Sequence, residues 1–68
     1  MVTNRILELR KKKQISQLKL AQDLGITRQT VHAIEKNKYN PSLELALRIA
    51  KYFNKQVEEI FWLKEDQR

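Results

Sequence analysis

The sequence predicts an all-α domain of five short helices. One glycine and one proline in 68 residues leave little room for β-turns, which favours helices over a many-stranded sheet. Apolar residues recur at helical spacing through most of the chain. A chain of this length buries only roughly 60% of its unfolded surface, so we expect one domain with a small core.

The first helix is expected from about Asn4 to Lys13, with Ile6 and Leu9 turned toward the core. Its last turn contains the basic run that starts at Arg10. Basic side chains at this end interact favourably with the helix dipole. They also suit contact with phosphate, and the two roles are compatible.

Residues 16–35 predict a second and a third helix joined by a tight turn. Ser16 and Thr27 have hydroxyl groups that can accept the free backbone N–H groups at the start of a helix. Gly25 supplies the left-handed backbone that residues with a β-carbon resist. The residues that helical spacing turns inward are Leu20, Ala21, Leu24, Val31 and Ile34.

The third helix has a face that the local core does not need. This face carries Arg28, Gln29, His32 and Lys36, which are long side chains able to form hydrogen bonds. A short helix of this kind, braced by a second helix, is what reading base edges in a DNA groove requires. We therefore expect double-stranded DNA as a partner.

A fourth helix is expected over residues 43–53. Asn37 lies where the third helix should end, in a left-handed conformation that asparagine tolerates. Ser42 can cap the fourth helix. Because apolar residues cover most of its sides, we expect this helix to be central.

The C-terminal residues predict a short fifth helix around 57–61. Beyond it, residues 61–63 are aromatic or apolar, and Val2 and Thr3 are β-branched. Such residues suit strands, so the two chain ends could pair as a very short antiparallel ribbon.

The net charge of +6 is confined to the first part of the chain. Residues 1–40 contain nine Lys or Arg and three Asp or Glu, whereas residues 41–68 contain five of each. A basic surface over one region is typical of a protein that binds a polyanion.

Composition argues against several other classes of protein. Without cysteine and with one histidine, the chain has neither a disulfide framework nor an obvious metal site, and we expect no cofactor and no small-molecule ligand. No apolar run approaches about 18 residues and the N-terminus has no signal-peptide core, so we expect a cytoplasmic protein without a membrane partner. No catalytic set is evident, which argues against an enzyme.

The order of the motifs is similar to that of one family. I-x-x-L-R at 6–10 precedes I-S-Q-x-x-L-A at 15–21, L-G-I-T-R-Q-T-V at 24–31 and I-E-K at 34–36, and then N-P-S-L and R-I-A follow. The sequence resembles the Cro/lambda-repressor-like helix-turn-helix family, also called the Xre family. The resemblance implies a five-helix lambda-repressor-like DNA-binding domain over residues 1–68, with the helix-turn-helix at 16–36. In one small dimeric member the chain ends form an antiparallel sheet, which implies that residues 2–4 pair with residues 62–64.

The resemblance also implies roles for individual residues. Arg28, Gln29 and Ala33 occupy the principal base-reading positions, and their chemistry suits guanine, adenine and the thymine methyl group respectively. His32 is grouped with them, although an exposed residue without a DNA contact is an equally good interpretation. Gln17 would contact phosphate and brace a recognition side chain. The other residues expected at phosphates are Thr27, Thr30, Lys36, Lys38 and Asn40.

The resemblance also implies an ion pair inside the domain. Arg10 and Glu35 match family positions that form a buried ion pair between the first and third helices.

The resemblance implies a homodimer, because one short helix offers too few base contacts for a specific site. Val57, Ile60 and Phe61, within a dimerisation region at about 54–66, are expected at its interface because they exceed what a small core can hide.

The leading function is a sequence-specific transcriptional regulator, most simply a repressor that binds a palindromic operator as a homodimer. A second hypothesis is an antitoxin whose main role is to bind a partner protein, with DNA binding used for autoregulation. A neighbouring toxin-like reading frame would favour that second hypothesis.

Overall fold

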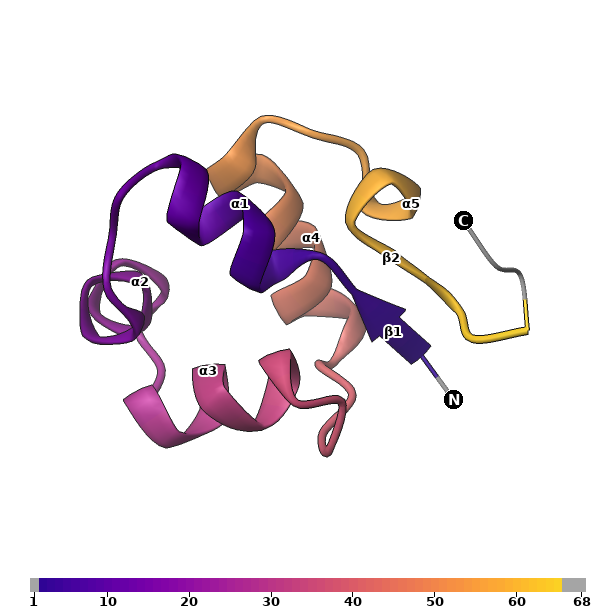
Figure 1. Cartoon of the computed structure of the whole chain (residues 1–68), viewed down its shortest axis with the longest axis horizontal. Helices are drawn as coiled ribbons and strands as arrows, with labels where there is room; N and C mark the ends of the chain where they lie inside the picture. The colour runs from indigo at the N-terminus through magenta and orange to yellow at the C-terminus, as the bar shows by residue number, and fades with distance from the viewer. Residues whose placement is uncertain (1, 66–68) are drawn as a thin grey trace.

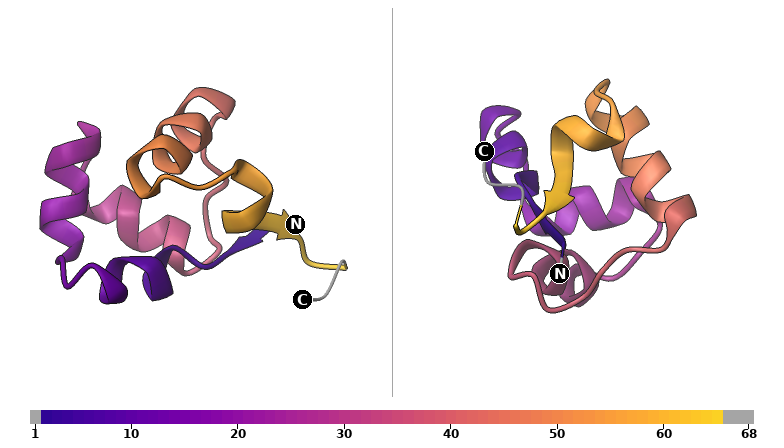
Figure 2. Two further views of the ribbon diagram at one scale, coloured as in Figure 1. Left: turned by 90° about the horizontal axis from the view of Figure 1, so that it is seen from above. Right: turned by 90° about the vertical axis from the view of Figure 1, so that its right-hand side faces the viewer.

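The computed structural model of the protein describes residues 2–65 and contains five short helices and one two-stranded sheet. Strands β1 (Val2–Asn4) and β2 (Phe61–Leu63) bring the two chain ends together on the side opposite α2, and α1 and α4 both lie above α3 in the view of Figure 1 (Figures 1 and 2). None of the helices between residues 2 and 65 is long and apolar enough to cross a bilayer. The helices are α1 (Ile6–Lys12), α2 (Gln17–Leu24), α3 (Arg28–Glu35), α4 (Leu43–Phe53) and α5 (Val57–Ile60).

Three helices begin at the hydroxyl residues predicted to cap them. Ser16, Thr27 and Ser42 each accept a hydrogen bond from the backbone N–H three residues later, at 3.0, 3.1 and 3.1 Å. Each bond satisfies one of the donors that a helix leaves free at its start. The predicted starts of α2, α3 and α4 are therefore confirmed.

Left-handed residues follow four of the helices. Gly25 has φ of 72° after α2, and Asn37 has φ of 60° after α3, as the sequence predicts. Gln14 and Asn54, with φ of 58° and 56°, have the same role after α1 and α4. The turn between α2 and α3 thus has the tight geometry that a helix-turn-helix needs.

Helix α1 begins at Ile6, later than the expected Asn4. Asn4 is the last residue of β1, and its side-chain oxygen accepts the backbone N–H of Ile6 at 3.0 Å. Its amide nitrogen donates to the carbonyl of Ile34 at 3.0 Å and lies 3.3 Å from Oδ1 of Asn37. Asn4 therefore connects β1, the start of α1 and the end of α3, a role that the sequence did not reveal.

The expected ribbon between the chain ends forms, but its register differs by one residue. Val2 pairs with Leu63, and Asn4 pairs with Phe61, so the second strand is 61–63 and not 62–64. Helix α5 ends at Ile60, whose carbonyl accepts the backbone N–H of Arg5 at 3.0 Å. Phe61 is already extended, which moves the strand back by one position.

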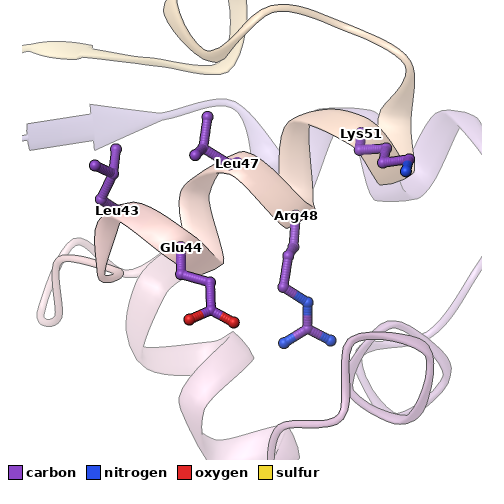
Figure 3. Close-up of a pocket in the computed structure, with 5 residues that line it drawn as sticks. All are labelled: Leu43, Glu44, Leu47, Arg48 and Lys51. Carbon is purple, nitrogen blue, oxygen red and sulfur yellow. The ribbon is translucent and has the colours of Figure 1, made fainter.

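The core is formed by the inward-facing side chains of α1 to α5 together with Phe61. All of the residues that spacing turned inward on the first three helices are buried. Helix α4 is less central than predicted, because Leu43 and Leu47 remain 75% and 54% exposed on one side of it (Figure 3). A domain of this size has too little chain to surround one helix completely. The buried core residues are Ile6, Leu9, Leu20, Ala21, Leu24, Val31, Ile34, Leu45, Ala46, Ile49, Ala50, Phe53, Ile60 and Phe61.

The residues expected at a dimer interface lie mostly inside this core. Ile60 is 0% exposed and Phe61 is 7% exposed, whereas Val57 is half-buried. These two side chains are covered by the protein's own core, so little of their surface is left for a second copy. Their apolar character is accounted for within one chain, which corrects the premise that it exceeds what the core can hide.

Candidate nucleic-acid interface

Helix α3 lies on the surface with its apolar side turned inward. Val31 and Ile34 are each 2% exposed and fix the rotation of the helix against the core. The half-buried Ile26, in the turn before α3, packs against the same core. The opposite side of α3 is thereby held toward solvent in one orientation.

The structure brings four of the predicted DNA-contacting residues together. Arg28, Gln29 and His32 are exposed on α3, and together with Gln17 at the start of α2 they line one shallow hollow. Arg28 and His32 are one helical turn apart, as are Gln29 and the half-buried Ala33. Two adjacent rows of side chains therefore face outward, as contact with successive base pairs requires.

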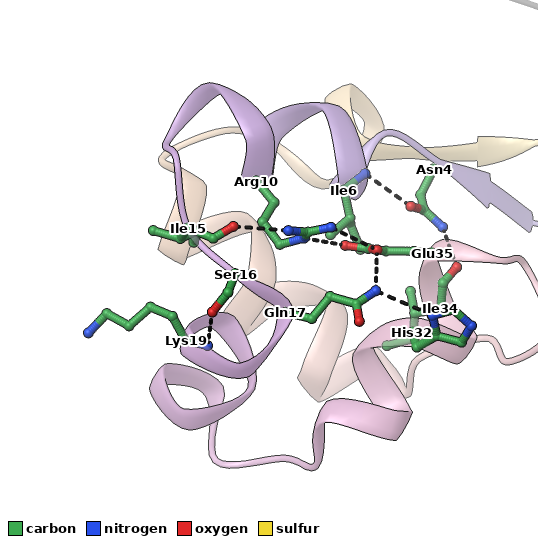
Figure 4. Close-up of polar contacts among 10 residues, drawn as sticks. All are labelled: Asn4, Ile6, Arg10, Ile15, Ser16, Gln17, Lys19, His32, Ile34 and Glu35. Atoms are coloured by element: carbon green, nitrogen blue, oxygen red, sulfur yellow. Dashed lines mark hydrogen bonds and ion pairs between the residues drawn. The ribbon is translucent and has the colours of Figure 1, made fainter.

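A buried ion pair supports this face from behind. Nε of Arg10 in α1 lies 2.7 Å from Oε2 of Glu35 in α3, and their side chains are 12% and 3% exposed (Figure 4). Arg10 also donates to the carbonyl of Ile15 at 2.9 Å. The pair that the resemblance implied is present, and its hydrogen bonds offset part of the cost of burying two charges.

Gln17 extends this network to the solvent-facing side of α3. Its Nε2 donates to Oε1 of Glu35 at 2.9 Å and lies 3.3 Å from Nδ1 of His32 (Figure 4). Sequence reasoning expected Gln17 to brace a recognition side chain but did not identify His32 as that side chain. The i, i+3 spacing of His32 and Glu35 is the signal that could have identified it.

The remaining residues expected at phosphates lie at both ends of α3. At its start, the hydroxyl groups of Thr27 and Thr30 lie 2.9 Å apart, and that of Thr27 also caps the helix. Lys36, Lys38 and Asn40 are exposed at its end and in the loop that follows. These residues therefore flank the hollow along the length of α3.

A polar contact between Tyr52 and Asp23 holds α2 against α4. Oη of Tyr52 donates to Oδ2 of Asp23 at 2.6 Å. This hydrogen bond raises the pKa of Tyr52 to about 12, because ionising the phenol beside a carboxylate is unfavourable. The same bond, together with Lys19 at 3.1 Å, lowers the pKa of Asp23.

Comparison with known proteins places the helices in a family. The family described as Helix-turn-helix matches residues 6–60, which run from the first residue of α1 to the last of α5. The chain belongs to the helix-turn-helix family. The two capped helices around Gly25 are the motif that gives the family its name.

Relatives of this helix-turn-helix protein occur in bacteria and archaea. YgzD of Bacillus subtilis is 52% identical over 63 residues, which span 93% of this chain and 96% of the relative. A protein of Methanocaldococcus jannaschii is 45% identical over 64 residues, spanning 94% of this chain and 97% of the relative. Both are described as uncharacterized HTH-type transcriptional regulators.

A crystal structure of a candidate DNA-binding protein from Bacteroides fragilis has the same fold. Its TM-score against this chain is 0.80 at 27% identity, and the match covers 91% of this chain and 100% of that one. The overall fold of this chain therefore has a counterpart in an experimental structure.

Proposed function

We propose that this protein is a sequence-specific DNA-binding transcriptional repressor that inserts α3 into the major groove. The observation that carries the proposal is the exposed set of Arg28, Gln29 and His32 on a helix whose other face is buried. The major groove of B-DNA is wide enough to admit one α-helix, and each base pair presents a distinct pattern of hydrogen-bond donors and acceptors there.

The outward side chains have the chemistry that base reading needs. Arg28 can donate two hydrogen bonds to O6 and N7 of guanine, and Gln29 can pair with N6 and N7 of adenine. The methyl group of Ala33 is suited to apolar contact with thymine. These three residues are the proposed readers of sequence.

Contacts with the DNA backbone would set the position of α3 in the groove. Thr27 and Thr30 lie at one end of the helix, and Lys36, Lys38 and Asn40 lie at the other. Their hydroxyl, ammonium and amide groups donate to phosphate without reading sequence. The excess positive charge of residues 1–40 favours binding to a polyanion such as DNA.

The active form in this proposal is a homodimer on a palindromic operator. One eight-residue reading helix contacts few base pairs, whereas two copies related by a two-fold axis read half-sites about 34 Å apart. The ribbon between the chain ends supports the finer resemblance, to the small dimeric repressor of the cytolysin operon. Repression then follows from occupancy, because a bound dimer covers promoter DNA.

The proposed interface is the exposed part of the C-terminal region at about 54–66. Leu63 on β2 is 47% exposed and Val57 on α5 is half-buried, so these apolar side chains are accessible to a second copy. Residue 66 lies outside the described residues. Burying Leu63 against its symmetry mate would remove apolar surface from water, which favours association.

Selection of binding sites from a random pool of duplex DNA tests this function directly. The expected result is one enriched palindrome whose half-sites lie about one helical turn, or roughly 10 base pairs, apart. The double variant Arg28→Ala, Gln29→Ala is the matched control and should enrich no such palindrome while keeping its fold. A pool that remains random with the wild-type protein would overturn the proposal.

A further inference from the structure

We infer that Gln17 fixes the ring of His32 as a hydrogen-bond donor toward the DNA, which makes His32 a reader of guanine. This inference rests on the proposed function, because it assigns base specificity to the same face of α3. It adds a residue that determines specificity and a residue that positions it. It follows from a chain of four side chains that runs from the core to the surface.

The network begins with the ion pair of Arg10 and Glu35, which holds the Glu35 carboxylate in place. Oε2 of Glu35 lies 2.7 Å from Nε of Arg10, and Oε1 lies 3.4 Å from Nη2. Only 3% of the Glu35 side chain is exposed, and Arg10 is itself tied to the carbonyl of Ile15 at 2.9 Å. A carboxylate paired with an arginine can only accept hydrogen bonds.

This carboxylate decides which way the amide of Gln17 points. The amide end 2.9 Å from Oε1 of Glu35 must be the NH₂ group, because the amide oxygen would be repelled there. An NH₂ group has two hydrogens. One is used by Glu35, and the other is available to Nδ1 of His32 at 3.3 Å.

The amide in turn decides the tautomer of His32. Since Gln17 can only donate through its nitrogen, Nδ1 of His32 must be the acceptor, and the proton of the neutral ring lies on Nε2. His32 is exposed beside Arg28 and Gln29, and Nε2 is the ring nitrogen left for a partner outside the protein. The ring is therefore presented to the groove as a donor.

A donor at this place distinguishes among bases. Guanine presents two acceptors, N7 and O6, to the major groove, and thymine presents one acceptor, O4, beside its methyl group. Cytosine presents a donor, and adenine places a donor beside its acceptor, so guanine is the base that suits a donor best. The opposite tautomer would accept from adenine or cytosine instead. Gln17 thus selects the class of base that His32 reads although Gln17 itself contacts no base.

The same contacts argue against a phosphate role for the Gln17 side chain. Both hydrogens of its NH₂ group are engaged within the protein, by Glu35 and by His32. A bond to phosphate through this group would require one of the two bonds to break. Of the two roles expected for Gln17, bracing is the one that these contacts support.

A double-mutant cycle on DNA binding tests the inference. Dissociation constants are measured for the wild type, Gln17→Met, His32→Ala and the double variant, on the selected operator and on versions substituted at each base. His32→Ala should reduce the preference for guanine at one position by roughly 5- to 50-fold. Gln17→Met should lose part of that preference at the same position, and the double variant should be no worse than His32→Ala.

The outcomes separate this inference from the proposed function. If Gln17→Met weakens every sequence equally and adds to His32→Ala, Gln17 contacts phosphate and the inference is wrong. Sequence-specific binding that does not change in His32→Ala overturns the inference but leaves the proposed function standing. Wild-type protein without any sequence preference overturns both.

A measurement on the free protein removes the dependence on DNA. In ¹⁵N spectra of the neutral histidine ring, we expect the proton on Nε2, with Nδ1 unprotonated and hydrogen-bonded. Gln17→Met should shift the Nδ1 resonance, whereas Gln22→Ala, an exposed glutamine on the same helix, should not. A wild-type ring protonated at Nδ1 would contradict the assignment. Thermal melts of each variant show whether the fold is kept.

Discussion

Arg48 donates a hydrogen bond from Nη2 to the carbonyl of Leu24, at 2.5 Å. Leu24 is the last residue of α2, where the carbonyls have no partner within the helix. Arg48 belongs to α4, so this bond connects α4 to the turn that precedes α3. The position of α3 relative to α2 is therefore held from outside the helix-turn-helix as well as by Gly25.

Replacing Arg48 with alanine should loosen this turn. We expect the free energy of unfolding to fall by about 1 kcal/mol, because the Leu24 carbonyl loses a charge-assisted hydrogen bond. Urea denaturation measures the change. Lys51→Ala, at an exposed position one turn further along α4, is the matched control, and an equal loss in that variant would mean that the bond to Leu24 does not matter.

Base-reading and phosphate-contacting residues should differ in how their loss depends on sequence and salt. Arg28→Ala should weaken binding to the operator by about 1–3 kcal/mol and relax specificity at one base position. Lys38→Ala should weaken all sequences alike and reduce the dependence of binding on salt. Titrations of specific and random duplexes over a range of salt concentrations separate these effects. An equal loss on both duplexes in Arg28→Ala would contradict its assignment as a reader.

The Tyr52–Asp23 contact predicts how stability depends on pH. Because the pKa of Tyr52 is raised from 10.0 to about 12, its contribution is complete below pH 10.0 and is lost as the pH rises toward 12. The pKa of Asp23 is lowered, so its contribution is present above its ordinary value of 3.8 and is lost as the pH falls below that value. Tyr52→Phe should reduce stability at neutral pH and flatten the profile at both extremes.

Urea midpoints across this pH range compare the two proteins, and absorbance of ionised tyrosine follows the phenol directly. The difference between the wild-type and Tyr52→Phe titrations isolates Tyr52 from Tyr39. If the tyrosine isolated by this difference titrates at the ordinary phenol pKa of 10.0, the bond to Asp23 is absent in solution.

The proposed dimer can be tested on two exposed leucines. Leu63→Glu should shift the protein toward monomer in sedimentation experiments, because a carboxylate would be buried against its symmetry mate. Leu47→Glu on α4 is matched to it, since Leu47 and Leu63 are 54% and 47% exposed. Dissociation by Leu47→Glu alone would place the interface on α4, and a wild-type monomer at micromolar concentration would rule out the dimer.

Features set by neighbouring residues in the chain could be predicted from the sequence. The hydroxyl caps at Ser16, Thr27 and Ser42 depend on bonds three residues away, and the left-handed turn at Gly25 depends on one residue. Helical spacing was also sufficient to identify the inward face of α2 and α3. For these elements, local chemistry and the tertiary structure agree.

Features that depend on distant partners could not be predicted in the same way. An apolar pattern does not say whether Ile60 is buried by its own chain or by a second copy, and the structure buries it within one chain. Leu43 and Leu47 look equally central in the sequence but lie on the outer side of α4. The contact between Gln17 and His32 joins two helices, so only their packing places the two side chains together.

The ribbon between β1 and β2 has a consequence for the order in which parts of the fold can form during synthesis. Residues 2–4 are synthesised well before their partners at 61–63, so the two strands cannot pair until those partners have been made. Asn4, which holds the end of α3 through the carbonyl of Ile34, is itself anchored by that late pairing. A nascent chain can form its helices early, but this added support for the end of α3 is available only once residues 61–63 have been made. Chains that end before residue 61 would therefore lack this support at the end of α3.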